Sequence, residues 1–263
     1  MKFILNSCEI PFSFTQTPSR IISLVPSQTE LLFNLGLVKS LVGITKFCVH
    51  PKELKAQIAQ VGGTKKINIK TIKNLNPDII ICNREENTAL MVEELSEFCL
   101  VLVTDIATIN DNINMIFSFG QLFDRENEAR LWIDKINSAY THFKIFIQSQ
   151  PVKKVVYFIW KNPYMVAAAG TFIDEMLRIN NFKNVYENEN RYPVIELEKT
   201  VEKSPDILFL SSEPYPFKKK DADEITKIIT NVKIIFVDGE MFSWYGTRVL
   251  EAFGYFRILH SQI

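Results

Sequence analysis

Residues 124–148 read DRENEARLWIDKINSAYTHFKIFIQ, and the rest of the chain is arranged around them. The apolar side chains between Ala129 and Ile147 recur at three- and four-residue steps, and charged residues occupy the other faces. No Gly or Pro interrupts the stretch, Asp124 can cap its first N–H groups, and Pro151 follows its end. The pattern predicts an amphipathic helix about 35 Å long. It is either a long surface helix or a strut between two lobes, and the flanking sequence decides.

The composition is typical of a soluble globular protein. Hydrophobic residues make up 47% of the 263 residues and charged residues 23%, so the chain can form one large α/β domain or two lobes. Thirty basic residues balance thirty acidic ones, which argues against a nucleic-acid or anionic-membrane partner. We expect a small-molecule partner and a monomer. The chain has no CxxC pair, and free thiols are expected at Cys8, Cys48, Cys82 and Cys99.

The N-terminal residues carry no recognisable export signal. The apolar run after Lys2 covers only Phe3–Leu5, whereas a signal peptide needs about 7 to 15 apolar residues. No stretch approaches the roughly 18 to 20 apolar residues that a membrane span requires. We therefore expect a cytoplasmic protein. The alternative is a periplasmic protein whose upstream leader is missing from this sequence.

The segments before and after the long helix begin alike. Arg20–Val25 is a short Ile- and Val-rich run, typical of a buried parallel strand, and Ser27–Glu30 after it fits a capping box. After the long helix, Lys154–Ile159 is the counterpart of this strand, and Thr171–Asp174 is the counterpart of the capping box. Each half therefore predicts a strand that leads into a capped helix. Further strands are predicted at Leu41–Ile44, Leu100–Val103 and Ile234–Val237.

The sharpest internal match is a Pro-Asp pair that precedes a strand in each half. Asn76–Asp78 leads into the strand Ile79–Cys82, and Ser204–Asp206 leads into a second apolar run. A similar short helix starts upstream of each pair, at Lys70–Ile72 and at Lys199–Val201. Proline cannot continue a helix and keeps the residue before it out of the α region, so the chain turns directly into the strand. The two copies predict a duplicated βα layout with a parallel sheet in each half.

This duplication favours the interpretation of the long helix as a strut between two lobes. We predict an α/β fold of two parallel-sheet βα lobes that are joined by a long backbone helix, with a ligand cleft between the lobes. The predicted parts are an N-terminal α/β lobe at residues 1–123, a linking helix at 124–150 and a C-terminal α/β lobe at 151–263.

Candidate ligand contacts follow from a rule for open parallel sheets, in which ligands bind beyond the carboxyl ends of the strands. In the first lobe these positions are Pro26, Ser27, Lys46, Phe47, Cys48, His50, Asn83 and Arg84. In the second lobe they are Trp160, Lys161, Tyr164, Glu213, Tyr215, Phe242, Ser243, Trp244 and Tyr245. The last stretch holds three aromatic residues, whose flat side chains suit a broad, partly apolar ligand such as a macrocycle. Alternatively, these aromatics pack helices against the sheet.

Cys48 and His50 could place one axial ligand on the metal of a bound cobalt or iron macrocycle, although two residues are too few for a closed zinc site. The alternative is that Cys48 is a small buried group and His50 a loop residue beside Pro51. The sequence contains no GxSxG elbow, P-loop, HExxH or GxGxxG motif. We therefore expect that the protein is not an enzyme and that it has no cofactor of its own.

The order of several short segments is similar to that of one known family. The segments are RIISLVPSQTELLFNLG at 20–36, VGIT at 42–45, NPDIIIC at 76–82, the long helix and the second Pro-Asp strand. In this order the chain resembles the helical-backbone substrate-binding proteins of ABC importers for cobalamin, haem and iron–siderophore complexes. The resemblance runs from Arg20 to the C-terminus. It implies a two-lobed receptor with little hinge motion, and the loops of Phe47 and Trp244 resemble those that line the corrinoid cleft of the family.

The resemblance and the charges together favour a corrinoid ligand. Receptors for anionic iron–siderophore complexes tend to show several Arg, Tyr or His residues, and the candidate contacts offer only Lys46, Arg84 and Lys161 as cations. We expect a soluble substrate-binding protein for a corrinoid-like (cobalamin-like) metal chelate. The alternatives are haem or iron–siderophore binding, or a cytoplasmic metal- or tetrapyrrole-handling enzyme or sensor on the same fold. For the enzyme, the candidate groups are Cys48, His50 and Glu213.

The resemblance also implies an ABC permease as partner. Family members often dock through one glutamate per lobe, near the start of the short helix before each Pro-Asp strand. Glu198 matches this position in the second lobe, whereas Lys70 holds it in the first. A positive charge at Lys70 would repel an arginine of the permease, so this position departs from the family pattern.

Overall fold

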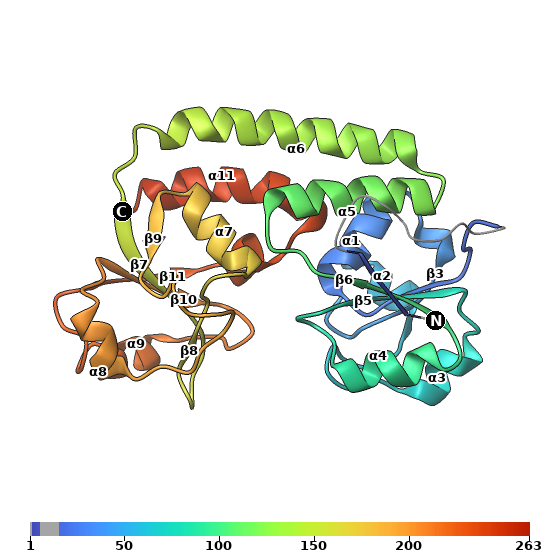
Figure 1. The fold of residues 1–263 in the computed structure, drawn as a ribbon, viewed down its shortest axis with the longest axis horizontal. Coiled ribbons are helices and arrows are strands. Elements are labelled where there is room, and N and C mark those ends of the chain that lie inside the picture. Colours follow the sequence, from blue (N-terminus) through green and yellow to red (C-terminus); the bar gives the residue numbers. More distant parts are fainter. Residues whose placement is uncertain (1, 6–15) are drawn as a thin grey trace. The chain divides into compact units, whose positions relative to one another are not determined.

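The computed structural model describes residues 2–5 and 16–263, which fold into two compact units. Among the described residues, unit 1 comprises those up to 106, 110–137 and 245–249, and unit 2 comprises 107–109, 138–244 and 250–263. Each unit is built around one β-sheet with helices packed on it (Figure 1). The predicted architecture of two α/β lobes is therefore confirmed.

The sheet of unit 1 is parallel throughout, in the order β1-β6-β5-β2-β3-β4. Its strands are β1 (Lys2–Leu5), β2 (Ile21–Ser23), β3 (Leu41–Ile44), β4 (Ala59–Gln60), β5 (Ile79–Asn83) and β6 (Leu100–Thr104). Its helices are α1 (Pro26–Asn34), α2 (Leu54–Gln57), α3 (Ile69–Asn74), α4 (Ala89–Ser96) and most of α5 (Ile109–Leu122), with a 3₁₀ turn at Val38–Ser40. Helices α3 and α4 pack on one face around Ile72, Ile80 and Leu95, and α1 and α5 lie on the other face (Figure 1). Strand β1 is an addition that the sequence pattern did not predict.

The sheet of unit 2 has the order β11-β10-β7-β8, and β9 also pairs with β7. Its strands are β7 (Lys153–Trp160), β8 (Met165–Val166), β9 (Phe182–Asn184), β10 (Ile207–Ser211) and β11 (Lys233–Val237). Its helices are α7 (Phe172–Ile179), α8 (Leu197–Glu202), α9 (Lys219–Ile225), α10 (Gly239–Ser243) and most of α11 (Val249–His260). The prediction of a parallel sheet is wrong for β8, which runs antiparallel to β7. The connection between these strands is too short for the crossover of about a dozen residues that parallel pairing requires.

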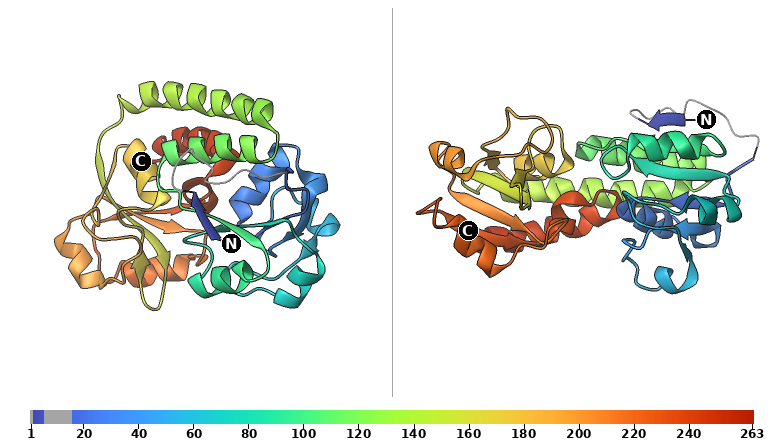
Figure 2. Two further views of the ribbon diagram at one scale, coloured as in Figure 1. Left: turned by 45° about the vertical axis from the view of Figure 1, so that its right-hand side comes forward. Right: turned by 90° about the horizontal axis from the view of Figure 1, so that it is seen from below.

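Helix α6 (Glu126–Ile147) begins two residues after the start and ends three residues before the end of the predicted linking helix at 124–150, and it is continuous in Figure 1 and in the left-hand view of Figure 2. The chain passes from unit 1 to unit 2 within this helix, after Asn137. In unit 1 the indole N–H of Trp132 donates to the Asn34 carbonyl at 3.2 Å. In unit 2 Phe143 is fully buried, with its ring 5.4 Å from that of Phe253 on α11. The apolar stripe of the helix therefore packs within both units.

The two Pro-Asp pairs have the same structural role in the two units. The Asp78 carboxylate accepts the N–H of Arg20 at 2.9 Å, and the Arg20 carbonyl accepts the N–H of Asp78 at 2.8 Å. In unit 2, Asp206 exchanges the same two bonds with Lys154, at 2.7 and 2.8 Å. Each aspartate thus ties the start of its own strand to the start of the neighbouring strand, which explains why the pair recurs.

The residue before each proline also adopts the same conformation. Asn76 and Ser204 both lie in the left-handed region, with φ of 44° and 49°. Helices α3 and α8 start at the same distance before the two aspartates. By this register Lys70 corresponds to Glu198, rather than to Lys199 as the sequence match suggested.

The predicted capping box of α1 is wrong, and that of α7 forms only in part. Helix α1 begins at Pro26, so Ser27 and Glu30 lie inside it, and its cap residue Val25 makes no side-chain bond. In α7 the Thr171 hydroxyl accepts the N–H of Asp174 at 3.1 Å, as expected, but the Asp174 carboxylate accepts from Asn184. The SxxE spacing therefore marked a helix start correctly in α1 but not its cap.

Three cysteines, Cys48, Cys82 and Cys99, are buried free thiols, and Cys8 lies outside the described residues. No helix in the described part of the chain is long and apolar enough to cross a membrane.

Candidate functional site

In unit 1, buried polar side chains meet at the carboxyl ends of β2, β5 and β6. The predicted contact Asn83, at the end of β5, donates from its amide to the Thr104 carbonyl at 3.0 Å. Gln28, in the first turn of α1, donates to the Thr104 hydroxyl at 2.5 Å and to the Tyr245 hydroxyl at 3.1 Å. The predicted contacts Asn83 and Tyr245 are therefore brought into one network. Pro26 and the buried Ser27 precede Gln28 in the same helical turn.

The loop that follows β5 is held by its own asparagines. The Asn83 side chain accepts the N–H of Glu85 at 2.8 Å, and the Asn87 side chain accepts the N–H of Asn83 at 2.9 Å. The amide of Asn87 also donates to the Thr64 carbonyl at 2.9 Å. These bonds fix a loop that presents polar groups beyond the sheet, a geometry suited to orienting a ligand.

The loop after β3 carries an exposed aromatic ring. Phe47 is 48% exposed, and the Lys46 ammonium lies 5.0 Å from its ring centre. The ring also packs on the turn at Gly63, where a Cβ atom would lie only 3.0 Å from it. A glycine at this position lets the Phe47 ring lie against the turn.

The candidate metal ligand Cys48 is fully buried. Its sulfur lies 3.1 Å from the Thr29 hydroxyl and 3.3 Å from the Thr45 hydroxyl, and burial raises the pKa of the thiol. A neutral, enclosed thiol fits the packing alternative rather than axial coordination. His50 is partly exposed in the same loop. Within residues 2–5 and 16–263, no group of three or more His, Cys, Asp or Glu residues could hold a metal ion by itself.

In unit 2, aromatic side chains lie at the carboxyl ends of β7 and β10. Trp160 is 40% exposed, and its ring meets that of Tyr215 edge-on at 5.7 Å. Tyr164 packs on Phe158 at 5.9 Å. Trp160 and Tyr215 therefore form a partly exposed aromatic pair on this edge of the sheet.

The neighbouring Lys161 is engaged by two carboxylates. Its ammonium lies 2.7 Å from Asp221 and 2.6 Å from Glu224. The hydrogen bonds to Asp221 and Glu224 raise the pKa of Lys161. Burial raises the pKa of Asp221, but the bonds from Lys161 and the Lys218 N–H outweigh it and lower that pKa. Lys161 thus stays charged, and its charge is neutralised within unit 2.

Glu213 holds the loop after α10. One oxygen of its carboxylate accepts from the Trp244 indole at 2.9 Å and from the Ser243 hydroxyl at 2.8 Å. The predicted contacts Glu213, Ser243 and Trp244 are therefore brought together. Gly239 allows the Glu213 side chain to lie against the start of α10, since a Cβ at this position would lie 2.5 Å from that side chain.

The three neighbouring aromatics do not form one exposed cluster. Phe242 is fully buried, 5.0 Å from the ring of Tyr157 and 4.9 Å from that of Phe256, so it packs α10 and α11 on the sheet of unit 2. Trp244 is 7% exposed in unit 2, whereas Tyr245 belongs to unit 1. The expectation that all three present their faces to a ligand is therefore corrected, because all three side chains are buried, with Tyr245 only 5% exposed.

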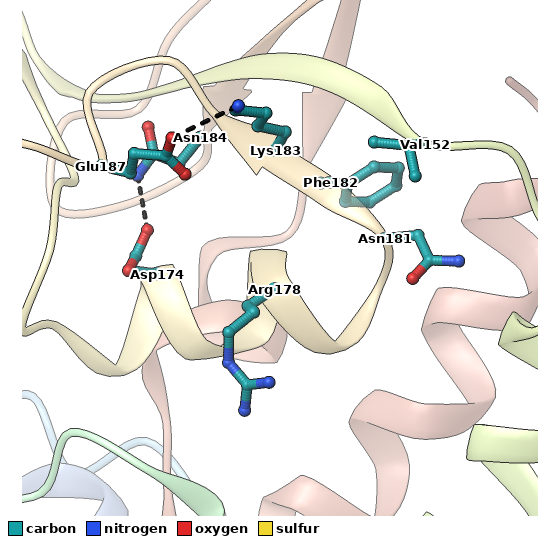
Figure 3. Close-up of a pocket in the computed structure, with 8 residues that line it drawn as sticks. All are labelled: Val152, Asp174, Arg178, Asn181, Phe182, Lys183, Asn184 and Glu187. Carbon is teal, nitrogen blue, oxygen red and sulfur yellow. Dashed lines mark hydrogen bonds and ion pairs between the residues drawn. The ribbon is translucent and has the colours of Figure 1, made fainter.

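A groove of about 270 Å³ lies elsewhere in unit 2, between α7 and β9 (Figure 3). Its lining residues are Val152, Asp174, Arg178, Asn181, Phe182, Lys183, Asn184 and Glu187. Strand β9 pairs with the amino end of β7, so the groove is at the opposite end of the strand from Trp160. Several of its polar side chains bond one another, such as Lys183 with Glu187 at 3.5 Å. None of the predicted contacts lines it.

The model of the family described as periplasmic binding protein matches residues 21–230 of this sequence. The chain belongs to the periplasmic binding protein family. The vitamin B12-binding protein of Vibrio vulnificus strain CMCP6 is 26% identical over 200 residues, which cover 73% of this chain and 71% of that protein. These family members are binding proteins, which is consistent with the absence of an enzyme motif from the sequence.

Solved structures of periplasmic binding proteins share the fold. A Staphylococcus epidermidis protein, described as a possible iron-binding periplasmic solute-binding protein, has a TM-score of 0.78 and 26% identity, covering 92% of this chain and 98% of its own. The periplasmic haem-binding protein RhuT of Roseiflexus has a TM-score of 0.79 at 17% identity, covering 93% and 98%. The ligands in these names differ, so family membership alone leaves the ligand open.

One feature of this periplasmic binding protein was missed in the sequence. Glu30 and Arg248 form an ion pair at 2.6 Å in unit 1. No local sequence pattern indicates that pair, since its partners lie far apart in the chain.

Proposed function

We propose that this chain is the substrate-binding protein of an ABC-type uptake system and that its ligand is an uncharged, corrinoid-like metal chelate. Family membership supports the class of binding protein. The B12-binding relatives support the corrinoid, and the iron- and haem-binding neighbours define the alternatives. The ligand contacts are those at the strand ends of each unit, led by Phe47 in unit 1 and Trp160 with Tyr215 in unit 2.

The observation that carries the choice of ligand is the paired state of two of the three candidate cations, Arg84 and Lys161. Arg84 lies 2.7 Å from the Asp105 carboxylate, and Lys161 lies between Asp221 and Glu224. A ligand with several carboxylate or catecholate groups would have to displace these internal partners before it gained a cation. An uncharged chelate needs flat apolar contacts and a few hydrogen bonds, which the exposed aromatics and the polar strand-end loops supply.

The alternatives differ in support. Haem or an iron–siderophore complex remains a second candidate, because the structural neighbours are named for iron or haem binding. An enzyme or sensor on this fold finds no support among the relatives. The axial role of His50 remains part of the proposal, whereas the buried Cys48 is set aside.

The permease contact is a further part of the proposal. Glu198 is exposed on α8, where a partner can reach it, and Lys70 is exposed at the matching position of α3. We expect Glu198→Lys to reduce binding to the permease, whereas Asp134→Lys, at an exposed position on α6, should not affect it. Stimulation of ATP hydrolysis by the reconstituted permease would measure this effect.

The proposed function also predicts the cellular compartment in which the protein works. The structural neighbours named above are described as periplasmic, and the cytoplasmic prediction finds no support among them. We propose that the protein works on the outer side of the cytoplasmic membrane. Fractionation of the source cells, with an antibody to the protein, tests this directly.

The ligand is tested by titrating the purified protein with cyanocobalamin, haemin, ferrichrome and ferric enterobactin, followed by tryptophan fluorescence and calorimetry. We expect saturable binding of cyanocobalamin with quenching that Trp160→Phe reduces and Trp132→Phe, on α6, does not. Binding of haemin or a ferric siderophore without cyanocobalamin binding would reject the corrinoid. Absence of binding to all four would reject the receptor function.

A further inference from the structure

The Asp221 carboxylate lies at the centre of a polar network in unit 2. Asp221 is fully buried in the first turn of α9. Its Oδ1 atom accepts from the Lys161 ammonium at 2.7 Å and from the Tyr215 hydroxyl at 3.4 Å. Its Oδ2 atom accepts the N–H of Lys218 at 2.9 Å. One buried side chain therefore joins the segments that follow β7 and β10 to the start of α9.

Tyr215 connects this network to the partly exposed ring of Trp160. The two rings meet edge-on at 5.7 Å, and the Tyr215 ring also packs edge-on against Phe217 at 4.8 Å. The Tyr215 N–H donates to the Ile159 carbonyl at 3.3 Å. The strength of an edge-on aromatic contact depends on the angle between the rings. The bond from the Tyr215 hydroxyl to Asp221 therefore helps to keep this ring in the orientation that supports Trp160.

The same carboxylate holds the cation that lies next to Trp160 in the sequence. Lys161 directly follows Trp160, yet its side chain is only 9% exposed. Its second partner, Glu224, lies 2.6 Å from the ammonium but has a side chain that is 51% exposed. An exposed ion pair is weak, so an anionic ligand displaces Glu224 at small cost, whereas separating the buried Asp221 from Lys161 is costly. Asp221 is therefore the partner that keeps Lys161 from a ligand.

We propose that Asp221 is a positioning residue that sets the ligand preference of this edge of unit 2, and the proposal rests on the proposed function. By holding Tyr215, it keeps the aromatic pair oriented for a flat, uncharged chelate. By holding Lys161, it denies a cation to anionic chelates. Removal of the Asp221 charge releases both groups, so the preference shifts from an uncharged chelate toward an anionic one.

The test is calorimetry of Asp221→Asn in the full chain with cyanocobalamin, ferric enterobactin and ferrichrome, which is an uncharged iron chelate. The asparagine keeps an acceptor for the Lys218 N–H but no longer neutralises Lys161. We expect the affinity for cyanocobalamin to fall by about threefold to tenfold, because the aromatic contact loosens. The affinity for ferric enterobactin should rise by about tenfold or more, because a charged donor becomes available to it. The affinity for ferrichrome should not rise.

Two matched variants separate the position of Asp221 from its charge. Glu224→Gln removes the other carboxylate that bonds the Lys161 ammonium and should keep the wild-type preference. Asp223→Asn changes an exposed carboxylate on α9 and should also keep it. When Asp221→Asn is combined with Lys161→Met, the gain in ferric enterobactin binding should disappear, whereas the loss of cyanocobalamin affinity should remain.

An unchanged preference in Asp221→Asn, or an equal shift in Glu224→Gln, would overturn the proposal and leave the proposed function standing. Wild-type affinity for cyanocobalamin in the double variant would overturn the role of Asp221 in holding Tyr215. The double variant leaves neither member of the buried pair alone, so it decides this point even if Asp221→Asn does not fold. Failure of the wild-type protein to bind cyanocobalamin would instead reject the corrinoid function, and the Asp221 proposal with it.

Discussion

Arg248 and Glu30 form a buried, two-point ion pair within unit 1, although 218 residues separate them. The Arg248 Nε lies 2.8 Å from one carboxylate oxygen, and Nη2 lies 2.6 Å from the other. The pair fastens the segment Tyr245–Val249 to α1, the helix whose first turn bears Ser27 and Gln28. The C-terminal part of the sequence thereby helps to position candidate contacts of unit 1.

The same segment is held by further polar contacts. The Asn112 side chain accepts the N–H of Gly246 at 2.6 Å and donates to its carbonyl at 3.1 Å. Gly246 has φ of +87°, and a Cβ there would lie 3.2 Å from the Ser27 carbonyl. Asn34 donates to the Thr247 hydroxyl at 2.6 Å. Hydrogen bonds of this kind require specific distances and angles, so they hold the segment Tyr245–Val249 in one conformation.

Breaking the buried pair should destabilise the protein strongly. Arg248→Ala leaves the Glu30 carboxylate in a largely buried position without its partner, and the expected loss is about 3–5 kcal/mol. Urea unfolding followed by circular dichroism measures it. The control Lys199→Ala removes an exposed pair with Glu196 and should cost at most about 1 kcal/mol. Equal losses in the two variants would contradict the importance of the buried pair.

The Asp78 carboxylate should make the stability depend on acid. Burial raises the pKa of Asp78, but the N–H groups of Ser19 and Arg20 outweigh it and lower that pKa below its usual value. A group whose pKa is lowered by folding stabilises the native state above its unfolded pKa, and this contribution is lost as the pH falls through the folded value. Below about pH 4, the wild type should therefore lose stability more steeply than Asp78→Asn.

Urea unfolding at a series of acidic pH values checks the prediction for Asp78. The exposed Asp134, on α6, supplies the control, and Asp134→Asn should follow the wild-type curve. A curve for Asp78→Asn parallel to that of the wild type would show that the two N–H bonds do not select the charged form.

The sequence predicted those parts of the fold whose cause is local. The apolar period placed α6, and the Pro-Asp pairs placed β5 and β10, because each pattern acts over a few neighbouring residues. The two-residue strand β8 offered too short a pattern to be recognised. The Ser27–Glu30 spacing was misread because α1 already begins at Pro26, and Glu30 instead pairs with Arg248, which no local pattern reveals.

The candidate site was predictable in outline for a similar reason. Topology places strand ends at one edge of a sheet, so Asn83, Trp160 and Glu213 could be named from their positions. Whether a strand-end aromatic faces solvent depends on distant packing. Phe242 turned inward onto Tyr157, a neighbour that only the folded chain supplies.

Phe47 and Phe242 should therefore respond in opposite ways to truncation. Phe242→Ala removes a fully buried ring and should cost about 3–5 kcal/mol of unfolding free energy. Phe47→Ala removes an exposed ring and should change stability by less than about 1 kcal/mol, while ligand affinity falls by about tenfold. Thermal unfolding and cyanocobalamin titration separate the two effects. Unchanged affinity in Phe47→Ala would remove this residue from the site.

The paired state of Arg84 gives the sharpest distinction between ligand classes. Its side chain is 63% exposed yet bonded to Asp105, so an uncharged chelate gains little from it. We expect Arg84→Ala to leave the affinity for cyanocobalamin within about threefold of the wild type, because an exposed pair contributes at most about 1 kcal/mol. Asp105→Ala, which releases the arginine, should by contrast improve the binding of an anionic complex such as ferric enterobactin. If Arg84→Ala weakens binding of the natural ligand by a hundredfold or more, about 2.7 kcal/mol, then the arginine contacts a negative group and the ligand is anionic.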